Sequence, residues 1–360
     1  GEGKAMHKSL GNGVDPADVT SKWGADVLRL WVASADYAQD VSISDNILKQ
    51  VSDAYRRFRN TFRFLLGNLS DFDDQANSVS NWDDLEPIDQ YMMAKTAQLL
   101  SDVEQAYDSF KFNGVYRAVY DFVNDLSSVY MDVTKDRLYS ESPDSPRRRA
   151  VQTVLFNILE VLVRVLSPIL SFTADEVWEC YPEAMRNREG RVCNGQLAGW
   201  PHRSDFVPAL PGKAAEDKVL AAFGGALEVR DVVTKALEEA RGAKVINKSQ
   251  EATVSVTAPQ ATLDALSAFD ASVFEELFIV SGVTFAAGDE LACEVKPAEG
   301  DKCPRCWNYR ELGGNANHAD VCQRCGDSGQ SGIQLFSDFR QMRFSGIGRD
   351  GRGDCDGYCA

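Results

Sequence analysis

The sequence predicts a mainly α-helical protein, in which a helix bundle is followed by a small α/β module and a compact four-cysteine unit. Long segments with apolar residues every three or four positions fill most of residues 46–200. From about residue 213, helical patterns mix with short alternating patterns that are typical of strands. Two Cys-x2-Cys pairs then lie close together before a Gly- and Arg-rich end.

Four long amphipathic segments predict the bundle. They cover residues 44–69, 88–110, 114–139 and 145–166. Ser44 or Asp45 can cap the first segment, and Ser145 can cap the last with Pro146 in its first turn. The last segment is more apolar all round than the others, so we expect it at the centre of the bundle.

Shorter elements flank these segments. We expect a helix over residues 23–34, an acidic linker over 70–87 and a helix over 172–181 that Thr173 caps. The later elements expected are helices over 216–244 and 258–269 and strands over 251–259, 276–285 and 291–297. The Gly224-Gly225 pair weakens the first of these helices.

Five units follow from these patterns. They are a loop and helical connector over 1–45, a helical domain over 46–200, a small α/β junction module over 201–297, a four-cysteine ribbon over 298–327 and a tail over 328–360. The tail is rich in Gly and Arg and has little pattern, so we expect it to be disordered.

Composition narrows the class of protein. A chain of 360 residues suggests two or three domains. The net charge of −16 argues against indiscriminate nucleic-acid binding, although a local basic face could still bind. Neither a run of about 18 apolar residues nor a secretory signal occurs, so we expect a cytoplasmic protein without membrane contact.

The cysteine spacing predicts a structural zinc site. Cys303 and Cys306 form one pair, and Cys322 and Cys325 form a second pair fifteen residues later. Two such turns can complete a tetrahedron of thiolates around Zn²⁺, which leaves no open position for catalysis. The alternatives are two disulfides or four unrelated thiols, and His318 is a rival ligand.

Cationic and aromatic residues lie beside these cysteines, notably Arg305 and Trp307. Such residues contact phosphates and stack on unpaired bases. The alternative is that Trp307 and Tyr309 cover the metal site, because a ribbon has little other core. The pattern alone leaves both interpretations open.

The opening residues GEGKAMHKS contain glycines, lysines and a hydroxyl, but they do not form a Walker loop. Read with the segments MHKSLGN, DPADV and GADVLRLWVASADY, however, they resemble the KMSKS region of class I aminoacyl-tRNA synthetases. The later segments PILSFTADEVW and KCPRCW are most similar to the bacterial isoleucyl-tRNA synthetase family. The resemblance runs from residue 1 to about residue 326.

The resemblance assigns roles to the opening loop. The KMSKS motif falls on Ala5, Met6, His7, Lys8 and Ser9, so the first lysine and the serine of the motif are replaced. The family's loop closes on ATP, which is used with Mg²⁺, and Lys8 takes the role of stabilising phosphate charge. We expect Lys4 to supply part of the missing charge.

The resemblance also assigns the helical domain to anticodon binding. Arg56, Arg59 and Arg63 lie on one helix face and could contact tRNA phosphates or form a solvated stripe, and Arg147-Arg148-Arg149 has the same ambiguity. In the family the ribbon and the small module help engage the anticodon end of the tRNA. This favours RNA contact by Arg305 and Trp307.

The function that the resemblance implies is ATP-dependent attachment of isoleucine to its tRNA by a monomeric enzyme. The family's HIGH signature does not occur in the sequence, so we expect it upstream and expect the chain alone to be inactive. The alternatives are a stand-alone, non-catalytic tRNA-binding module or remnant, a valyl or leucyl relative, and a DNA-repair-type zinc ribbon on an unrelated helical protein.

Overall fold

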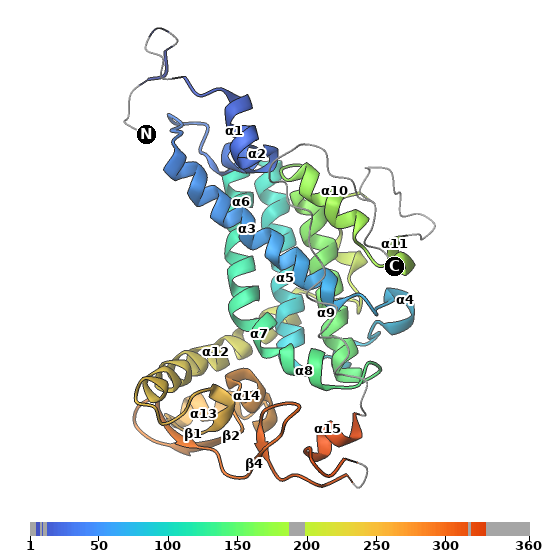
Figure 1. Cartoon of the computed structure of the whole chain (residues 1–360), viewed down its shortest axis with the longest axis vertical. Coiled ribbons are helices and arrows are strands. Elements are labelled where there is room, and N and C mark those ends of the chain that lie inside the picture. The colour runs from blue at the N-terminus through green and yellow to red at the C-terminus, as the bar shows by residue number, and fades with distance from the viewer. Residues whose placement is uncertain (1–4, 8, 10–12, 187–198, 316–317, 329–360) are drawn as a thin grey trace.

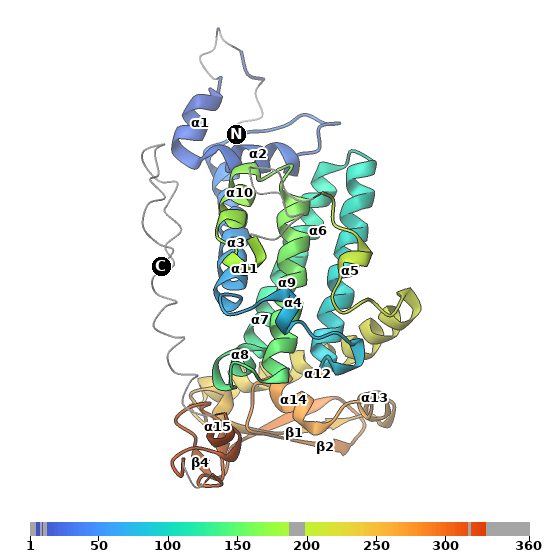
Figure 2. The ribbon, with the colours of Figure 1, turned by 90° about the vertical axis from the view of Figure 1, so that its right-hand side faces the viewer.

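The computed structural model describes residues 5–7, 9, 13–186, 199–315 and 318–328. A connector of two helices, α1 (Pro16–Trp23) and α2 (Ala25–Ser34), lies at one end of a helix bundle. A layer made of a long helix, a small sheet and the cysteine ribbon lies at the other end (Figures 1 and 2). The order of fold elements predicted from the sequence is therefore confirmed.

The bundle is built on α3 (Asp45–Asn68), α5 (Pro87–Asp108), α6 (Phe112–Asp125) and α9 (Pro146–Leu166). The Ser44 hydroxyl caps α3 by accepting a hydrogen bond from the Ile47 N–H at 3.3 Å, as expected. Ser145 also stands at the N-cap of α9, but its hydroxyl bonds Glu141 instead of the helix. Nearly every residue of α9 is buried, which confirms its predicted central position.

Two of the expected helices differ from the structure. The helix predicted over 114–139 is divided into α6, a π-helical turn at Leu126–Tyr130, α7 (Met131–Val133) and α8 (Lys135–Ser140). Thr173 does not cap the next helix, because α10 (Ser171–Glu179) begins two residues earlier. The linker contains only the short helix α4 (Asp74–Asn77) and a single 3-10 turn, and α11 (Glu183–Arg186) follows α10.

Helix α12 (Lys213–Gly242) joins the bundle to the small module. It runs without interruption through Gly224-Gly225, which the sequence predicted would weaken it. Phe223 on α12 stacks on Tyr91 of α5 with ring centroids 4.8 Å apart, and this apolar contact offsets the low helix propensity of glycine. The helix is thereby fixed across the end of the bundle.

A three-stranded mixed sheet forms the core of the module. Strand β1 (Ala252–Ala258) lies between β2 (Gly282–Ala287), which is parallel to it, and β3 (Ala292–Pro297), which is antiparallel. Helix α13 (Gln260–Leu266) follows β1 as expected. The strand predicted over 276–285 is partly wrong, because residues 276–278 end the helix α14 (Ala271–Phe278).

The apolar residues of α14 explain this error. Phe274, Leu277 and Phe278 are buried at helical spacing, and Ile279 ends the helix in the left-handed conformation with φ of 58°. The cysteine ribbon follows with β4 (Asp301–Lys302), β5 (Tyr309–Arg310) and α15 (Gln323–Asp327). No helix among the described residues is long and apolar enough to cross a membrane.

Candidate zinc centre and RNA-binding surface

The four predicted ligands meet at one point. Cys303, Cys306, Cys322 and Cys325 are buried free thiols whose Sγ atoms all lie within 4.8 Å of one another. The Sγ atoms of Cys306 and Cys322 are 3.9 Å apart. A Zn–S bond of about 2.3 Å would place tetrahedral sulfurs roughly 3.8 Å apart, so the cluster fits Zn²⁺. The disulfide alternative is wrong for these four residues.

Tight backbone turns aim the thiols inward. The Trp307 N–H donates to the Cys303 carbonyl at 2.9 Å in the first turn, and the Gly326 N–H donates to the Cys322 carbonyl at 2.9 Å in the second. A Cβ on Gly326 would lie 2.6 Å from Cβ of Asn315, so this position leaves no room for a side chain. His318 is not part of the cluster.

The thiols lie in surroundings that favour the thiolate form at one position. A hydrogen bond with the Cys325 thiol is the largest influence on Cys306, and burial opposes it. With the Asn308 backbone N–H and the Arg324 charge, the net effect lowers the pKa of Cys306 to about 5. The thiolate is the form that binds zinc. The hydrogen bond with Cys306 raises the pKa of Cys325 and burial raises the pKa of Cys322, so the charge of a bound ion would be needed to deprotonate these two thiols.

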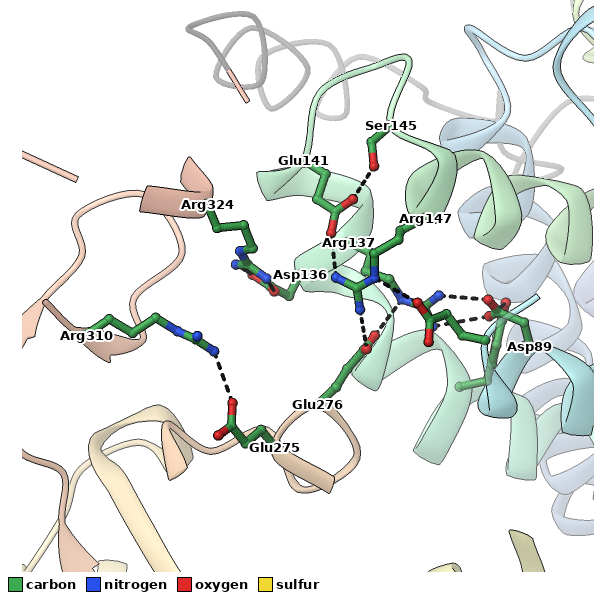
Figure 3. A network of polar contacts seen from close by, with 12 residues as sticks. Asp89, Asp136, Arg137, Glu141, Ser145, Arg147, Glu275, Glu276, Arg310 and Arg324 are labelled. Atoms are coloured by element: carbon green, nitrogen blue, oxygen red, sulfur yellow. Dashed lines mark hydrogen bonds and ion pairs between the residues drawn. The ribbon is translucent and has the colours of Figure 1, made fainter. Parts of the chain in front are cut away.

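The ribbon is attached to the rest of the molecule through two arginines (Figure 3). Arg324, which precedes the ligand Cys325, forms a two-pronged ion pair with Asp136 on α8, with one contact of 2.9 Å. Arg310 on β5 pairs with Glu275 on α14 at 3.2 Å. A cleft of about 290 Å³ remains between the ribbon, α8 and α14, and these ion pairs line it.

A buried charge network continues from this cleft into the bundle (Figure 3). The fully buried Arg137 donates to both carboxylate oxygens of Asp89 at 2.7 and 3.2 Å and to Glu276 at 2.5 Å. Arg147 joins Glu276, Glu141 and Glu86 at 2.7–2.9 Å. Because Glu276 lies on α14, the network fixes the module against the bundle.

The three consecutive arginines at the start of α9 all form ion pairs or hydrogen bonds within the protein. Arg148 binds both oxygens of Asp71 at 2.7 and 3.0 Å, and Arg149 binds the Asp71 carbonyl at 2.9 Å. Together with the Arg147 contacts, these pairs tie α9 to neighbouring elements. The sequence left two interpretations of this cluster open, a solvated stripe and contact with tRNA phosphates. The solvated stripe is wrong. The contacts favour a structural role over phosphate binding.

Trp307 lies on the outside of the ribbon. Its side chain is 48% exposed, its φ is 65°, and Leu312 and Val321 are the apolar residues that pack against the cysteines instead. The Lys248 ammonium lies 4.1 Å from the Trp307 ring centroid, and Lys302 lies 5.9 Å away. The part of the exposed ring that these ammonium groups leave open can stack on a base, and the ammonium groups can attract its phosphates. The partly buried Arg305 lies in the same turn.

The predicted arginine stripe on α3 is not uniform. Arg56 is exposed and pairs with Asp53. Arg59 is 16% exposed and turns inward to Glu176 at 3.2 Å. Arg63 is exposed and has no hydrogen-bond or ion-pair partner among the described residues. Arg63 is therefore the member of the stripe that is most open to a phosphate.

The opening loop is described only in part. Ala5, Met6, His7 and Ser9 are exposed, and Met6 is 54% exposed. Lys4 and Lys8 lie outside the described residues, as do the tail residues 329–360. The roles predicted for Lys4 and Lys8 stay predictions.

Sequence reasoning missed Lys248, Lys302 and Asp136. Lys248 lies 59 positions before Trp307, and Asp136 lies 188 positions before Arg324. No local pattern distinguishes these residues from ordinary surface charges. Lys302 lies in the ribbon itself, and only the fold brings Lys248 and Asp136 to it.

Comparisons with known proteins bear on these features. Residues 1–44 match the model "tRNA synthetases class I (I, L, M and V)", residues 89–256 match "Anticodon-binding domain of tRNA ligase", and residues 300–326 match "Zinc finger found in FPG and IleRS". An isoleucine–tRNA ligase of Geobacillus kaustophilus is 45% identical over 339 residues, which is 90% of this chain and 35% of the relative. Over nine tenths of its length the chain is therefore similar to about a third of an isoleucine–tRNA ligase.

Other relatives show the same similarity. Isoleucine–tRNA ligases of Geobacillus thermodenitrificans and Symbiobacterium thermophilum are 45% and 42% identical, each over 90% of this chain and 35% of the relative. The chain thus spans about a third of the length of these members of the isoleucyl-tRNA synthetase family. A solved ternary complex, Agrobacterium radiobacter K84 LeuRS-tRNA-LeuAMS, has a TM-score of 0.41 and 15% identity, covering 83% of this chain and 27% of that one.

The family match and the geometry agree on the metal. The matched zinc finger spans all four cysteines, and their buried Sγ atoms fit one ion. The structural zinc ribbon predicted from the sequence is confirmed.

Proposed function

We propose that this chain is the C-terminal, tRNA-binding portion of an isoleucine–tRNA ligase. The whole enzyme joins isoleucine to ATP, releases pyrophosphate and transfers the isoleucyl group to its tRNA. Support comes from the order of the three family matches along the chain, which is synthetase segment, anticodon-binding domain and zinc finger. The 45% identity to isoleucine–tRNA ligases favours isoleucine over valine or leucine. A cytoplasmic location and a monomeric state belong to the same proposal.

The observation that carries the tRNA-binding proposal is the exposed Trp307 with the ammonium groups of Lys248 and Lys302 close to its ring. The chain has a net charge of −16, so a favourable site for RNA has to be local. The Lys248 ammonium lies over the indole ring at 4.1 Å from its centroid, so a base would stack on the exposed part of the ring that this cation leaves open. The zinc site and the Arg324–Asp136 pair hold this surface in place.

Other predicted contacts have different support. Arg63 is exposed and without a partner among the described residues, so it is the member of the α3 stripe that we propose for a phosphate contact. Arg56 and Arg59 already pair with Asp53 and Glu176, and binding a phosphate would require these pairs to open. We keep the predicted unit boundaries at 45, 200, 297 and 327 as part of the proposal.

The ATP loop belongs to the proposal on the resemblance alone. Lys8 would stabilise negative charge on the ATP phosphates beside Mg²⁺ as the adenylate forms, and Lys4 would add positive charge in place of the motif's first lysine. Replacing Lys4 with alanine in the full-length enzyme should slow adenylate formation. An unchanged rate would remove Lys4 from the mechanism.

Substitution of Trp307 tests the proposed function. In the full-length enzyme, Trp307→Ala should weaken the binding of isoleucine-accepting tRNA by about 5- to 150-fold, because one base–aromatic stack contributes roughly 1–3 kcal/mol. ATP–pyrophosphate exchange and zinc content should stay unchanged. Filter binding, exchange assays and elemental analysis give the three readouts.

Phe172→Ala is the matched control, because Phe172 is an exposed aromatic residue, at 59%, on a different element, α10. It should leave tRNA affinity unchanged. Equal tRNA affinity of the Trp307→Ala variant and the unsubstituted enzyme would contradict the RNA-binding surface. A full-length enzyme that charges valine or leucine instead of isoleucine would contradict the proposed specificity.

A further inference from the structure

Asp26 is a buried carboxylate that joins two parts of the molecule. It lies in the first turn of α2, is 3% exposed, and belongs to the segment that matches class I synthetases. Its Oδ2 accepts hydrogen bonds from the Thr173 backbone N–H at 2.7 Å and from the Thr173 hydroxyl at 2.6 Å. Thr173 lies in the first turn of α10, so Asp26 supplies the cap that Thr173 was expected to provide.

The charge of Asp26 suits this position. The first N–H groups of a helix have no partner within the helix and carry partial positive charge. Leu170, the residue before α10, has no side chain that caps the helix. Asp26 caps it from a position 147 residues away in the sequence. The other oxygen, Oδ1, is buried and has no hydrogen-bond partner among the described residues. Such a group costs stability, so the contact with α10 has to offset that cost.

Arg29 reinforces the same junction. It lies one turn after Asp26 on α2 and donates to the carbonyls of Ile169 and Pro168, each at 2.8 Å. Its guanidinium also reaches the Ser171 hydroxyl at 3.1 Å. Asp26 and Arg29 therefore both bind the corner where α9 ends and α10 begins. Both views of the ribbon place α2 beside the start of α10 (Figures 1 and 2).

The junction continues into the bundle through polar contacts. The hydroxyls of Thr173 and Tyr55 on α3 are 2.8 Å apart, and Arg59 donates to the Tyr55 hydroxyl at 3.1 Å. Arg59 then pairs with Glu176 on α10 at 3.2 Å. Burial raises the pKa of Glu176, the Arg59 charge opposes that shift, and Asp26 adds a smaller upward effect. The contacts thus form one continuous chain across α2, α10 and α3.

We propose that Asp26 is a positioning residue that sets the orientation of the synthetase segment relative to the tRNA-binding bundle. Adenylate formation requires the catalytic part, and tRNA binding requires the bundle and ribbon. Transfer of the isoleucyl group requires both in register, since a displacement of about 1 Å at a reacting centre can cost roughly 100-fold in rate. The inference rests on the proposed function and adds a residue through which the two parts act together.

The test separates these steps in the full-length enzyme. Asp26→Ala should lower the kcat for charging tRNA with isoleucine by roughly 10- to 100-fold. The rate of ATP–pyrophosphate exchange and the Kd for tRNA should each change less than about twofold, because neither process depends on the relative orientation of the parts. Asp26→Asn should recover much of the charging rate, since its amide oxygen can still accept from Thr173.

Asp45→Ala is the matched control. Asp45 also joins the connector to the bundle, through an ion pair with Lys22 at 2.9 Å, but both side chains are more than half exposed. Such a pair contributes little, so charging should stay normal. Thr173→Val should reproduce part of the Asp26→Ala defect, because it removes the hydroxyl that Asp26 and Tyr55 share.

Three outcomes would overturn the inference. A normal charging rate in Asp26→Ala would show that orientation does not depend on this residue. An equal loss of exchange, tRNA binding and charging would show that Asp26 only supports folding. The same charging defect in Asp45→Ala would remove any special role of the buried contact. Failure of the unsubstituted enzyme to charge isoleucine would contradict the proposed function instead.

Discussion

The bundle buries α9 almost completely, whereas the ribbon buries little apart from its four cysteines and the two apolar residues that pack on them. Hydrophobic burial therefore stabilises the bundle, and metal coordination stabilises the ribbon. The charge networks hold the second part to the first, through Arg324 and Arg310 on the ribbon and Arg137 and Arg147 in the bundle. The two parts should accordingly fail under different conditions.

Loss of the metal should have the largest effect, and it should be confined to the ribbon. Cys303→Ser should reduce the zinc content from one ion per chain to none and unfold residues 300–328, because zinc binding contributes about 10–16 kcal/mol in comparable peptides. The helical far-UV circular dichroism of the bundle should change little. Elemental analysis and circular dichroism check the two halves of this prediction, and full zinc occupancy in the variant would disprove the ligand assignment.

A cavity in the bundle should have the opposite result. Leu159 on α9 is fully buried, so Leu159→Ala should lower the free energy of unfolding by about 2–5 kcal/mol while zinc stays bound. Urea unfolding followed by circular dichroism measures the loss. Val32→Ala is the control, since Val32 is 60% exposed and its truncation should cost less than about 0.5 kcal/mol. Equal effects at the two sites would contradict the assigned core.

The attachment of ribbon to bundle can be weakened without removing the metal. Asp136→Asn removes the negative charge that pairs with Arg324. The side chains of Arg324 and Asp136 are 28% and 29% exposed. Hydrogen exchange of backbone amides in residues 300–328 should rise several-fold, consistent with the loss of about 1 kcal/mol. Zinc content should remain one per chain. Unchanged exchange would mean that this ion pair does not hold the ribbon.

The smallest effect should come from the titration of one carboxylate in the bundle, Asp71. Burial raises the pKa of Asp71, but hydrogen bonds and charge from Arg148, with Gln152 and Arg149, outweigh it and lower the pKa below its usual value of 3.8. A lowered folded pKa stabilises the native state above pH 3.8, and this stability is lost as the pH falls through the folded value.

Asp71→Asn should therefore flatten the loss of bundle stability below about pH 4, by less than about 1 kcal/mol because Asp71 is 30% exposed. Urea midpoints at pH 6 and pH 3 measure this difference. Asp144→Asn is the control, since Asp144 is 91% exposed. An equally steep loss of bundle stability at acid pH in the Asp71 variant would contradict the pairing of Asp71 with Arg148.

The sequence predicted what local patterns determine. The periodicity of 145–166 identified the central helix, and the spacing of the cysteines identified the metal site, because each depends on residues that are close in sequence. It failed where a distant residue decides. Asp26, 147 residues away, caps α10 at Thr173, and residues 276–278 continue α14, where Glu276 pairs with Arg137 and Arg147 of the bundle.

The candidate functional residues show the same contrast between local and distant effects. Local composition singled out Trp307 and the arginines of α3, but it did not show which of these side chains are free to bind RNA. Lys248 became part of the Trp307 surface only through the fold, and Glu176 removed Arg59 from the exposed stripe. Charged residues look alike in a sequence, and their partners decide whether they stabilise the protein or contact a ligand.

The most direct test of the account is the affinity of this chain for isoleucine-accepting tRNA, measured with the zinc-loaded protein and with Cys303→Ser. If the ribbon holds the Trp307 surface in place, the Cys303→Ser variant should bind this tRNA about 5- to 150-fold more weakly. The bundle should keep its helicity. Equal affinities would contradict the account, because they would place tRNA binding entirely on the bundle.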